Sequence, residues 1–164
     1  MTAKFKAGES AGTYITDAPV TEADILQMAQ RLASQRLRKG QALHQPKEVF
    51  SYLQILLQDY EHEVFALVLL DCKHRVIRFQ ELFRGTLDAA SVYPREVVKL
   101  ALTHNAAAVI LVHNHPSGDP APSQADHVLT SRLKQALELV SIRTLDHIIV
   151  GSEGCVSLAE RGYL

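Results

Sequence analysis

The most informative stretch of this chain reads His113-Asn114-His115-Pro116-Ser117-Gly118-Asp119-Pro120-Ala121-Pro122-Ser123-Gln124-Ala125-Asp126. It follows an apolar run and ends where a helical pattern begins. Residues i and i+2 of a strand face the same side of a sheet, so the imidazoles of His113 and His115 can reach one ion. Asp126 lies at the start of the helix, which can return its carboxylate to the same point. Two imidazoles and one carboxylate predict a metal site with a fourth position open for water, as catalytic zinc sites require.

The loop and the helix start have further expected roles. Proline and glycine residues between the histidines and Ser123 are expected to stiffen the loop and keep the ligands preorganised. Ser123 has two interpretations that the sequence leaves open. Its hydroxyl can stabilise the oxyanion of a tetrahedral intermediate, or it can be the N-cap of a capping box with Asp126. Asn114 is expected to point away from the metal, toward packing or substrate.

A hydrolytic site also needs a carboxylate outside the ligand set, which takes the proton of water and passes it to the leaving amine. Glu63 is the first candidate, because it stands at the edge of an apolar run where a charge is otherwise costly. Glu61 lies two residues earlier on the same face and is the alternative base. A pair of solvated carboxylates is the simpler interpretation of both. Asp146 and His147 are candidates for orienting a ligand, or else form an ordinary half-buried polar pair.

The periodicity predicts an α/β fold in which helices flank a mixed sheet. Residues 1–19 look like a tail or an exchange segment, and Thr21 is expected to cap a helix that stops near Gly40. Further helices are expected from residue 46, over 94–105 and over 123–139. Strands are expected over 64–70, 75–83, 106–113, 143–150 and 155–158, with a break at Gly85-Thr86.

The chain has 164 residues, which is enough for one domain with a full core. Residues 1–40 form the expected N-terminal tail plus helix, a candidate for self-association into a homo-oligomer, and residues 41–164 form the domain that carries the chemistry. The net charge of −1 gives no support for nucleic-acid binding. We expect no secretory signal and no membrane span. Cys72 and Cys155 are interpreted as small buried hydrophobes in a cytoplasmic protein.

The spacing of His113, His115, Ser123 and Asp126 resembles the signature of the JAMM (MPN-plus) metalloproteases. The residues that surround them in this motif resemble the RadC-like branch of that superfamily. The resemblance covers residues 41–164 and includes the blocks Glu61-His62-Glu63-Val64-Phe65, Tyr93-Pro94-Arg95-Glu96, Asp146-His147-Ile148-Ile149-Val150-Gly151 and Glu160-Arg161-Gly162-Tyr163. It implies a cytidine-deaminase-like sandwich of helices and sheet. It further implies one Zn²⁺ held by the two histidines and the aspartate, with Ser123 beside the oxyanion.

The resemblance also implies a glutamate base, which favours Glu63 over Glu61 without excluding the latter, and a peptide or protein substrate cleaved at a peptide or isopeptide bond. One function class is therefore a zinc-dependent peptidase or isopeptidase. The alternative is a DNA-repair-associated or mobile-element accessory protein of the RadC type with a non-catalytic metal site. The family's DNA-repair label and a basic helix end with Arg31, Arg36, Arg38 and Lys39 argue for that alternative.

Overall fold

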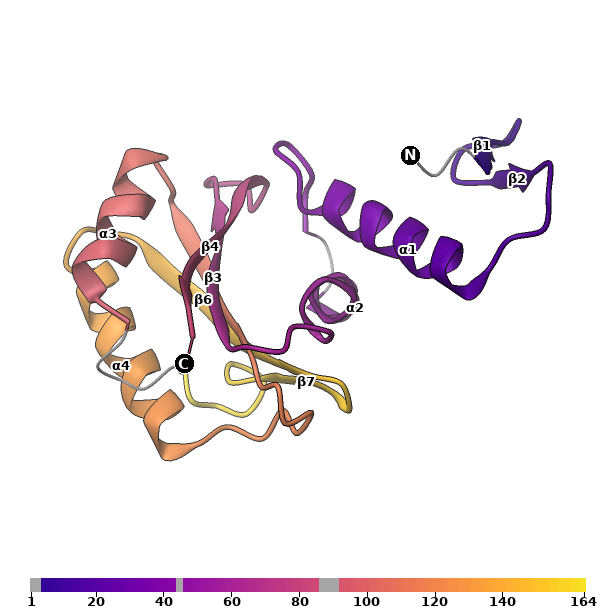
Figure 1. Ribbon diagram of the computed structural model, residues 1–164. Coiled ribbons are helices and arrows are strands. Elements are labelled where there is room, and N and C mark those ends of the chain that lie inside the picture. The colour runs from indigo at the N-terminus through magenta and orange to yellow at the C-terminus, as the bar shows by residue number, and fades with distance from the viewer. Residues whose placement is uncertain (1–3, 44–45, 86–91) are drawn as a thin grey trace.

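A computed structural model describes residues 4–43, 46–85 and 92–164 (Figure 1). In chain order, it forms β1 (Phe5–Ala7), β2 (Tyr14–Thr16), α1 (Glu22–Arg36), α2 (Pro46–Leu57), β3 (Val64–Leu70), β4 (Val76–Arg84), α3 (Pro94–Thr103), β5 (Ala108–Asn114), α4 (Gln124–Glu138), β6 (Arg143–Gly151) and β7 (Gly154–Ser157). Apart from the N-terminal elements discussed below, these bounds agree with the expected ones to within two residues. Thr86, the second residue of the expected strand break, lies outside the described residues.

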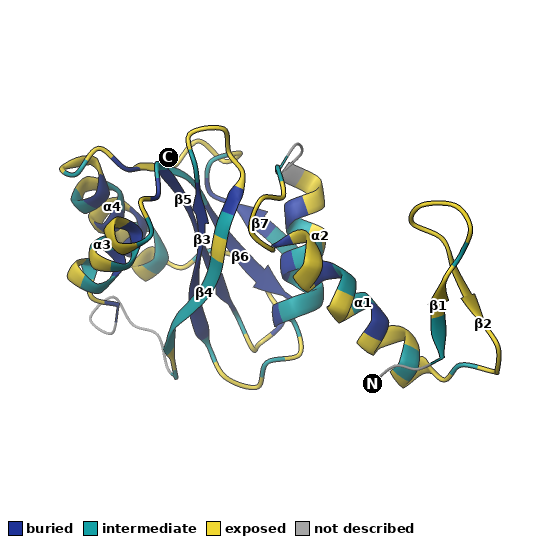
Figure 2. Ribbon diagram, turned by 90° about the horizontal axis from the view of Figure 1, so that it is seen from above, coloured by how far each residue is buried: buried dark blue, intermediate teal, exposed yellow. Residues whose placement is uncertain are grey.

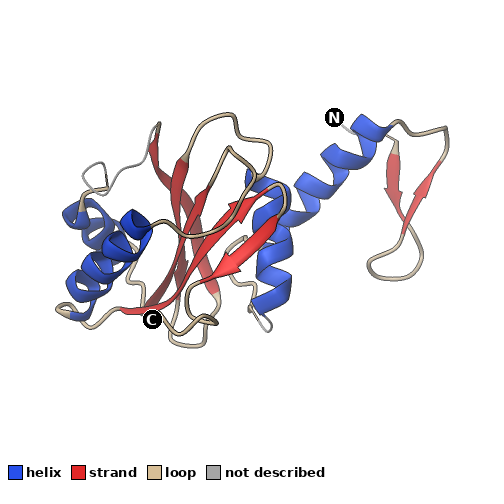
Figure 3. Ribbon diagram, turned by 90° about the horizontal axis from the view of Figure 1, so that it is seen from below, coloured by secondary structure: helices blue, strands red, loops and turns tan. Residues whose placement is uncertain are grey.

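The main sheet has the strand order β4-β3-β5-β6-β7. β5 and β6 run parallel, whereas the other neighbouring pairs run antiparallel. Helices cover both faces: α2 lies on one, and α3 and α4 lie on the other (Figure 3). The predicted α/β class with a mixed sheet flanked by helices is therefore confirmed.

The central strand β3 shows why both faces must be covered. All seven of its residues are buried, and alternate side chains of a strand point to opposite faces. Phe65, Leu67 and Leu69 pack beneath α3 and α4, and the even-numbered residues from Val64 to Leu70 pack beneath α2. An unbroken apolar run is what a strand between two helical layers requires.

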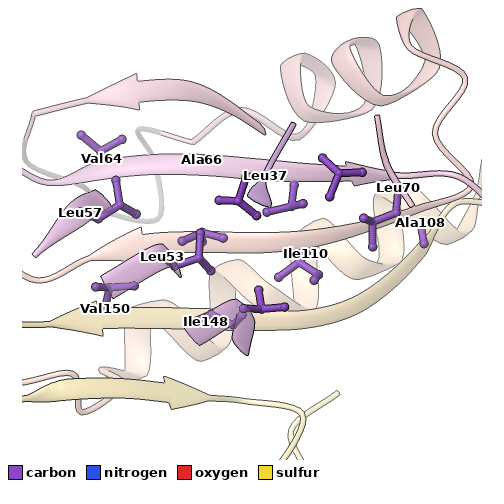
Figure 4. Close-up of a cluster of buried hydrophobic side chains, with 14 residues drawn as sticks. Leu37, Leu53, Leu57, Val64, Ala66, Leu70, Ala108, Ile110, Ile148 and Val150 are labelled. Atoms are coloured by element: carbon purple, nitrogen blue, oxygen red, sulfur yellow. The ribbon is translucent and has the colours of Figure 1, made fainter. Parts of the chain in front are cut away.

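Helix α2 is anchored through leucines on one of its faces (Figure 4). Leu53 and Leu57 are four residues apart, so they lie on the same side of the helix, and both are fully buried. They belong to the core cluster that also contains Ile148 and Val150 of β6. Burial of each leucine side chain contributes about 1.5–3 kcal/mol toward packing α2 on the sheet.

Helix α1 begins as expected but ends early. Thr21 caps it through a capping box, and the helix stops at Arg36 rather than near Gly40. Leu37 leaves the helix and is buried in the core under α2. Gly40 then adopts a φ of +90°, and its N–H donates to the carbonyl of Val76 at 2.7 Å. The glycine therefore serves the turn after the helix rather than the helix end itself.

The expected tail contains a hairpin. β1 and β2 pair antiparallel from Phe5 opposite Thr16 to Ala7 opposite Tyr14, and the hairpin stands apart from the main sheet beyond α1 (Figure 2). The sequence did not predict this hairpin within the tail, because strands of three mostly exposed residues carry no apolar alternation. Self-association through residues 1–40 stays a prediction, as does DNA binding by the exposed basic residues in and just after α1.

The two cysteines differ in burial. Cys155 is half-buried and burial raises the pKa of its thiol to about 11, which agrees with the expected inert role. Cys72 is exposed, so its predicted burial was wrong. It lies in a turn where the Asp71 carboxylate accepts the N–H groups of Lys73 and Arg75 at 2.8 and 2.9 Å, and this turn leaves the Cys72 side chain outside the core. Among the described residues, no helix is both long and apolar enough to cross a membrane.

Candidate metal centre

Three predicted ligands meet at one end of the sheet. β5 carries His113 and ends one residue before His115, while the first turn of α4 carries Asp126. One ligand atom from each of the three lies within 4.8 Å of the others. The chain between them folds back across the end of β5, so the sequence-predicted set is brought together.

The spacing of the ligand atoms suits one small ion. The two Nε2 atoms are 2.9 Å apart, and Asp126 Oδ1 lies 3.2 Å from His113 Nε2. Asp126 Oδ2 lies 3.6 Å from His115 Nε2. Ligands at 2.0–2.1 Å in a tetrahedral zinc site are roughly 3.3 Å from one another. Two nitrogens and one carboxylate oxygen are also a donor set that zinc accepts.

Hydrogen bonds turn both Nε2 atoms toward the centre. Nδ1 of His115 lies 2.9 Å from the carbonyl of Asp119. A carbonyl can only accept, so Nδ1 carries the proton and Nε2 keeps its lone pair. The Asp119 carbonyl of the loop therefore holds His115 in the tautomer that a metal ligand needs.

A buried chain of hydrogen bonds sets the tautomer of His113. The Thr130 hydroxyl donates to the carbonyl of Asp126 at 2.6 Å, so it accepts from His147 Nδ1, also at 2.6 Å. Nε2 of His147 is then the acceptor for His113 Nδ1 at 2.8 Å. This order of donors leaves His113 Nε2 with a free lone pair that faces the other ligands.

The charges of the site also favour a cation. Burial disfavours ionised Asp126, but when the two imidazoles are protonated at Nε2, their hydrogen bonds to its carboxylate outweigh that cost and hold the pKa of the carboxyl well below the usual range. The hydrogen bond with Asp126 raises the pKa of His115 above its ordinary value, and a metal ion that binds the Nε2 lone pairs takes the place of these protons. Complete burial holds the pKa of His147 well below its ordinary value, so this ring stays neutral. Asp126 is thus an anion in the state that a metal requires.

Ser123 caps α4. Its Oγ accepts the N–H of Asp126 at 3.2 Å and donates to Asp126 Oδ2 at 2.7 Å, and its own N–H donates to the same oxygen at 2.7 Å. The structure therefore shows the capping box that the sequence predicted. The hydrogen bonds of this capping box hold the Asp126 carboxylate in place. The oxyanion role stays a prediction that requires the Ser123 hydroxyl to change partner.

A cavity of about 620 Å³ opens over the candidate ligands. Both Glu61 and Glu63 line it, together with Ser117 and Ser123. Glu63 is half-buried and Glu61 is exposed. The negative charge of Glu63 adds a smaller contribution to that of Asp126 in raising the pKa of His115. The structure thus puts both candidate bases at the cavity, and the choice of Glu63 over Glu61 as base stays a prediction.

The loop that follows His115 rests on the turn between β6 and β7. The His115 N–H donates to the carbonyl of Val150 at 2.7 Å, and the Gly118 carbonyl accepts the N–H of Glu153 at 3.1 Å. A Cβ on Gly151 would lie 2.1 Å from the Gly118 oxygen. The close approach of two backbones therefore requires glycine at position 151.

Replacing Gly151 with alanine is expected to destabilise the protein by about 1–3 kcal/mol, because the new methyl must push the metal loop away from the turn. Urea unfolding measures the free energy, and the zinc content of the variant measures the effect on His115. Ser152→Ala at the neighbouring exposed position is the matched control and is expected to change stability by less than about 0.5 kcal/mol. Equal stability of the parent and the Gly151 variant would contradict the close approach.

Asp146 and His147, the two residues predicted to orient a ligand, bind different parts of the protein. His147 contacts a ligand directly, as described above. The Asp146 carboxylate instead accepts the Ser157 hydroxyl at 2.6 Å and the N–H of Ala159 at 3.0 Å. Neighbouring residues of a strand face opposite sides, so Asp146 serves β7 and the chain after it, and its predicted role toward the ligands was wrong. Sequence reasoning missed Thr130, for which no local pattern exists.

Replacing His147 with leucine is expected to weaken metal binding at this centre, tested with zinc, by about 10–100-fold, the usual effect of losing the partner that orients a ligand. The leucine fills the volume but leaves His113 Nδ1 without an acceptor. Competition with a zinc chelator measures the dissociation constant. His74→Leu, at an exposed histidine in the turn between β3 and β4, is the control and should bind zinc as the parent does. Unchanged affinity in His147→Leu would show that the chain of hydrogen bonds is dispensable.

Comparison with known proteins agrees with this site. The family described as RadC-like JAB domain matches residues 43–163. A UPF0758 protein of Vibrio cholerae is 54% identical over 151 residues, covering 92% of this chain and 95% of that protein. UPF0758 proteins of Ectopseudomonas mendocina and Azotobacter vinelandii are 57% and 56% identical over 140 residues. This chain spans only 62% of the length of each of those two. The chain belongs to the RadC-like JAB domain family, and its mixed sheet between helices is consistent with the JAB/MPN-like fold.

Proposed function

We propose that this protein is a zinc-dependent metallopeptidase or isopeptidase. The observation that carries the proposal is the convergence of His113 Nε2, His115 Nε2 and the Asp126 carboxylate, with both histidines held in the ligand tautomer. Membership of the JAB domain family supports hydrolysis as the reaction. The two nitrogens and one carboxylate support zinc as the metal.

Bound zinc would supply Lewis acidity that polarises an amide carbonyl and makes water a stronger acid. In the proposed reaction, Glu63 takes a proton from the attacking water, whose oxygen forms a bond to the carbonyl carbon. Glu63 then delivers the proton to the amide nitrogen as the C–N bond breaks, so the products are a carboxylic acid and an amine. The Ser123 hydroxyl gives up its hydrogen bond to Asp126 Oδ2 and donates to the developing oxyanion.

The surroundings of the site suit a polypeptide substrate. Glu61, Pro116, Ser117 and Ser123 line the cavity and are exposed. A rim of exposed residues around half-buried reactive groups lets an extended chain approach without opening the fold. The proposed substrate class is therefore a peptide or isopeptide bond in an exposed segment of a protein.

The test begins with metal content, measured by plasma mass spectrometry on protein purified without a metal-binding tag. We expect close to one zinc per chain in the parent and a loss of zinc in His113→Ala. Zinc-loaded protein is then incubated with a proteome-derived peptide library, and new peptide ends are identified by mass spectrometry. Cleavage by the parent but not by Glu63→Gln supports the proposal. A folded parent that binds no metal after zinc is added back, or a zinc-loaded parent that cleaves nothing, overturns it.

A further inference from the structure

The backbone ladder between β3 and β5 stops beside the metal centre. Its register runs from Leu70 opposite Ala108 to Phe65 opposite His113. Beyond that pair, β5 stays with β6, since the His115 N–H donates to the Val150 carbonyl. Glu63 lies in the segment just before β3. Within the described residues, the β3–β5 register pairs no β5 residue with that segment.

The side chain of Asn114 makes the hydrogen bonds that the backbone of β5 no longer makes at this point. Its Oδ1 accepts the N–H of Val64 at 2.7 Å, and its Nδ2 donates to the carbonyl of His62 at 3.1 Å. A side-chain amide has the same donor and acceptor as a peptide group. Asn114 thus extends the ladder of hydrogen bonds past the point where the β5 backbone leaves it.

The two bonded groups are those on either side of Glu63. The His62 carbonyl belongs to the peptide before Glu63, and the Val64 N–H belongs to the peptide after it. Fixing the orientation of both peptides fixes both backbone dihedral angles of Glu63. From the β4 side, the Gly85 N–H donates to the carbonyl of Glu63 at 2.9 Å. The direction in which the Glu63 side chain leaves the backbone is therefore determined from both sides.

The burial of Asn114 favours a specific task over simple packing. The residue is only 1% exposed, and burying an amide is costly unless its polar atoms are paired. An aliphatic residue of similar size fills the same space but leaves the Val64 N–H and the His62 carbonyl without this partner. Asn114 also stands between His113 and His115, so one tripeptide carries two ligands and the link to the candidate base.

We propose that Asn114 is a positioning residue that holds Glu63 over the metal centre by binding both of its flanking peptide groups. The inference rests on the proposed function for the role of Glu63 as base, but the clamp itself is a property of the fold. It assigns to Asn114 a task distinct from metal binding.

The first test needs no substrate. In zinc-loaded Asn114→Ala, we expect the Val64 amide to exchange hydrogen at least 10-fold faster than in the parent. We also expect the Glu63 side chain, followed by three-bond NMR couplings, to change from one χ1 rotamer to an average of several. Zinc affinity should stay within about threefold of the parent, because the Asn114 amide bonds to the backbone of Val64 and His62 and supplies no ligand atom. Asn114→Ser, which keeps one polar atom, replaces the alanine variant if the latter does not fold.

Ser157→Ala is the matched control, since Ser157 is also a buried polar residue and its hydroxyl binds Asp146. It should lose a comparable buried hydrogen bond while leaving both the Val64 exchange rate and the Glu63 couplings as in the parent. Unchanged exchange and couplings in folded Asn114→Ala, or the same changes in Ser157→Ala, would overturn the clamp.

The second test uses a peptide found in the library screen. Asn114→Ala is expected to lower kcat about 10–100-fold with KM changed less than about threefold, because base positioning acts on the chemical step. In the Glu63→Gln background, Asn114→Ala should cause no further loss, since residues that act as a unit are not additive. An equal loss in both backgrounds would overturn the positioning role. If the parent cleaves nothing but the NMR changes occur, the hydrolase proposal falls and the clamp stands.

Discussion

Replacing Glu63 with glutamine is expected to lower kcat by about 10²–10⁴-fold, the usual contribution of a positioned general base. The amide has the size of the carboxylate but cannot take a proton from water at neutral pH. Zinc content should stay at the parent level, because the ligand atoms come from β5, the loop after it and α4. Plasma mass spectrometry of the metal and mass-spectrometric rates of peptide cleavage, measured on the same preparation, separate the two effects.

Glu61→Gln is the matched control. Glu61 lines the same cavity but is exposed, and Asn114 binds the peptide groups that flank Glu63, not those that flank Glu61. We expect less than about a threefold loss for this variant, which is small against the effect of a general base. If Glu61→Gln causes the large loss instead, the role of base passes to Glu61. If neither substitution affects cleavage, a glutamate base is excluded.

Replacing Asp126 with asparagine is expected to weaken zinc binding by more than about 100-fold, which exceeds the effect of losing a partner that only orients a ligand. The substitution removes the site's anionic ligand but keeps an oxygen that can accept the N–H and the hydroxyl of Ser123. Helix α4 should therefore begin where it does now, and the helical circular dichroism should match the parent. Chelator competition measures the zinc dissociation constant.

The control for this change is Asp146→Asn. The Asp146 carboxylate binds Ser157 and the backbone after β7, so the same chemical change at that position should cost some stability and leave zinc affinity unchanged. Zinc affinity within 10-fold of the parent in Asp126→Asn would remove the aspartate from the ligand set. A loss of zinc in both variants would point to a general effect on the fold.

Much of the candidate site could be predicted because its spacing is local. His113 and His115 are two residues apart, near the end of β5 and just past it, and this spacing turns both rings to one side. Asp126 is the third residue of α4, so the capping box at the helix start brings it to Ser123. The capping box and the continuous apolar run of β3 have equally local causes. The exposed hairpin of β1 and β2 had no such signal, and neither did the turn that exposes Cys72.

The contacts that prepare the site for chemistry join distant parts of the chain. Asn114 reaches Val64 across 50 positions, and His113 reaches His147 across 34. The sequence offered Asn114 only as a residue pointing away from the metal, and it offered Asp146 and His147 as equal candidates. The register of β3 on β5 and of β5 on β6 decides which of these side chains meets a ligand or a base.

The α/β class, the candidate ligand set and the pair of candidate bases can be predicted from the sequence, because the periods of strand and helix place nearby residues on defined faces. The contacts of His147 with His113, of Asp146 with β7 and of Asn114 with the backbone around Glu63 could not be predicted in this way. Each of these depends on strand pairing between residues far apart along the chain. A shift of one residue in that pairing turns every side chain of the strand to the opposite face of the sheet.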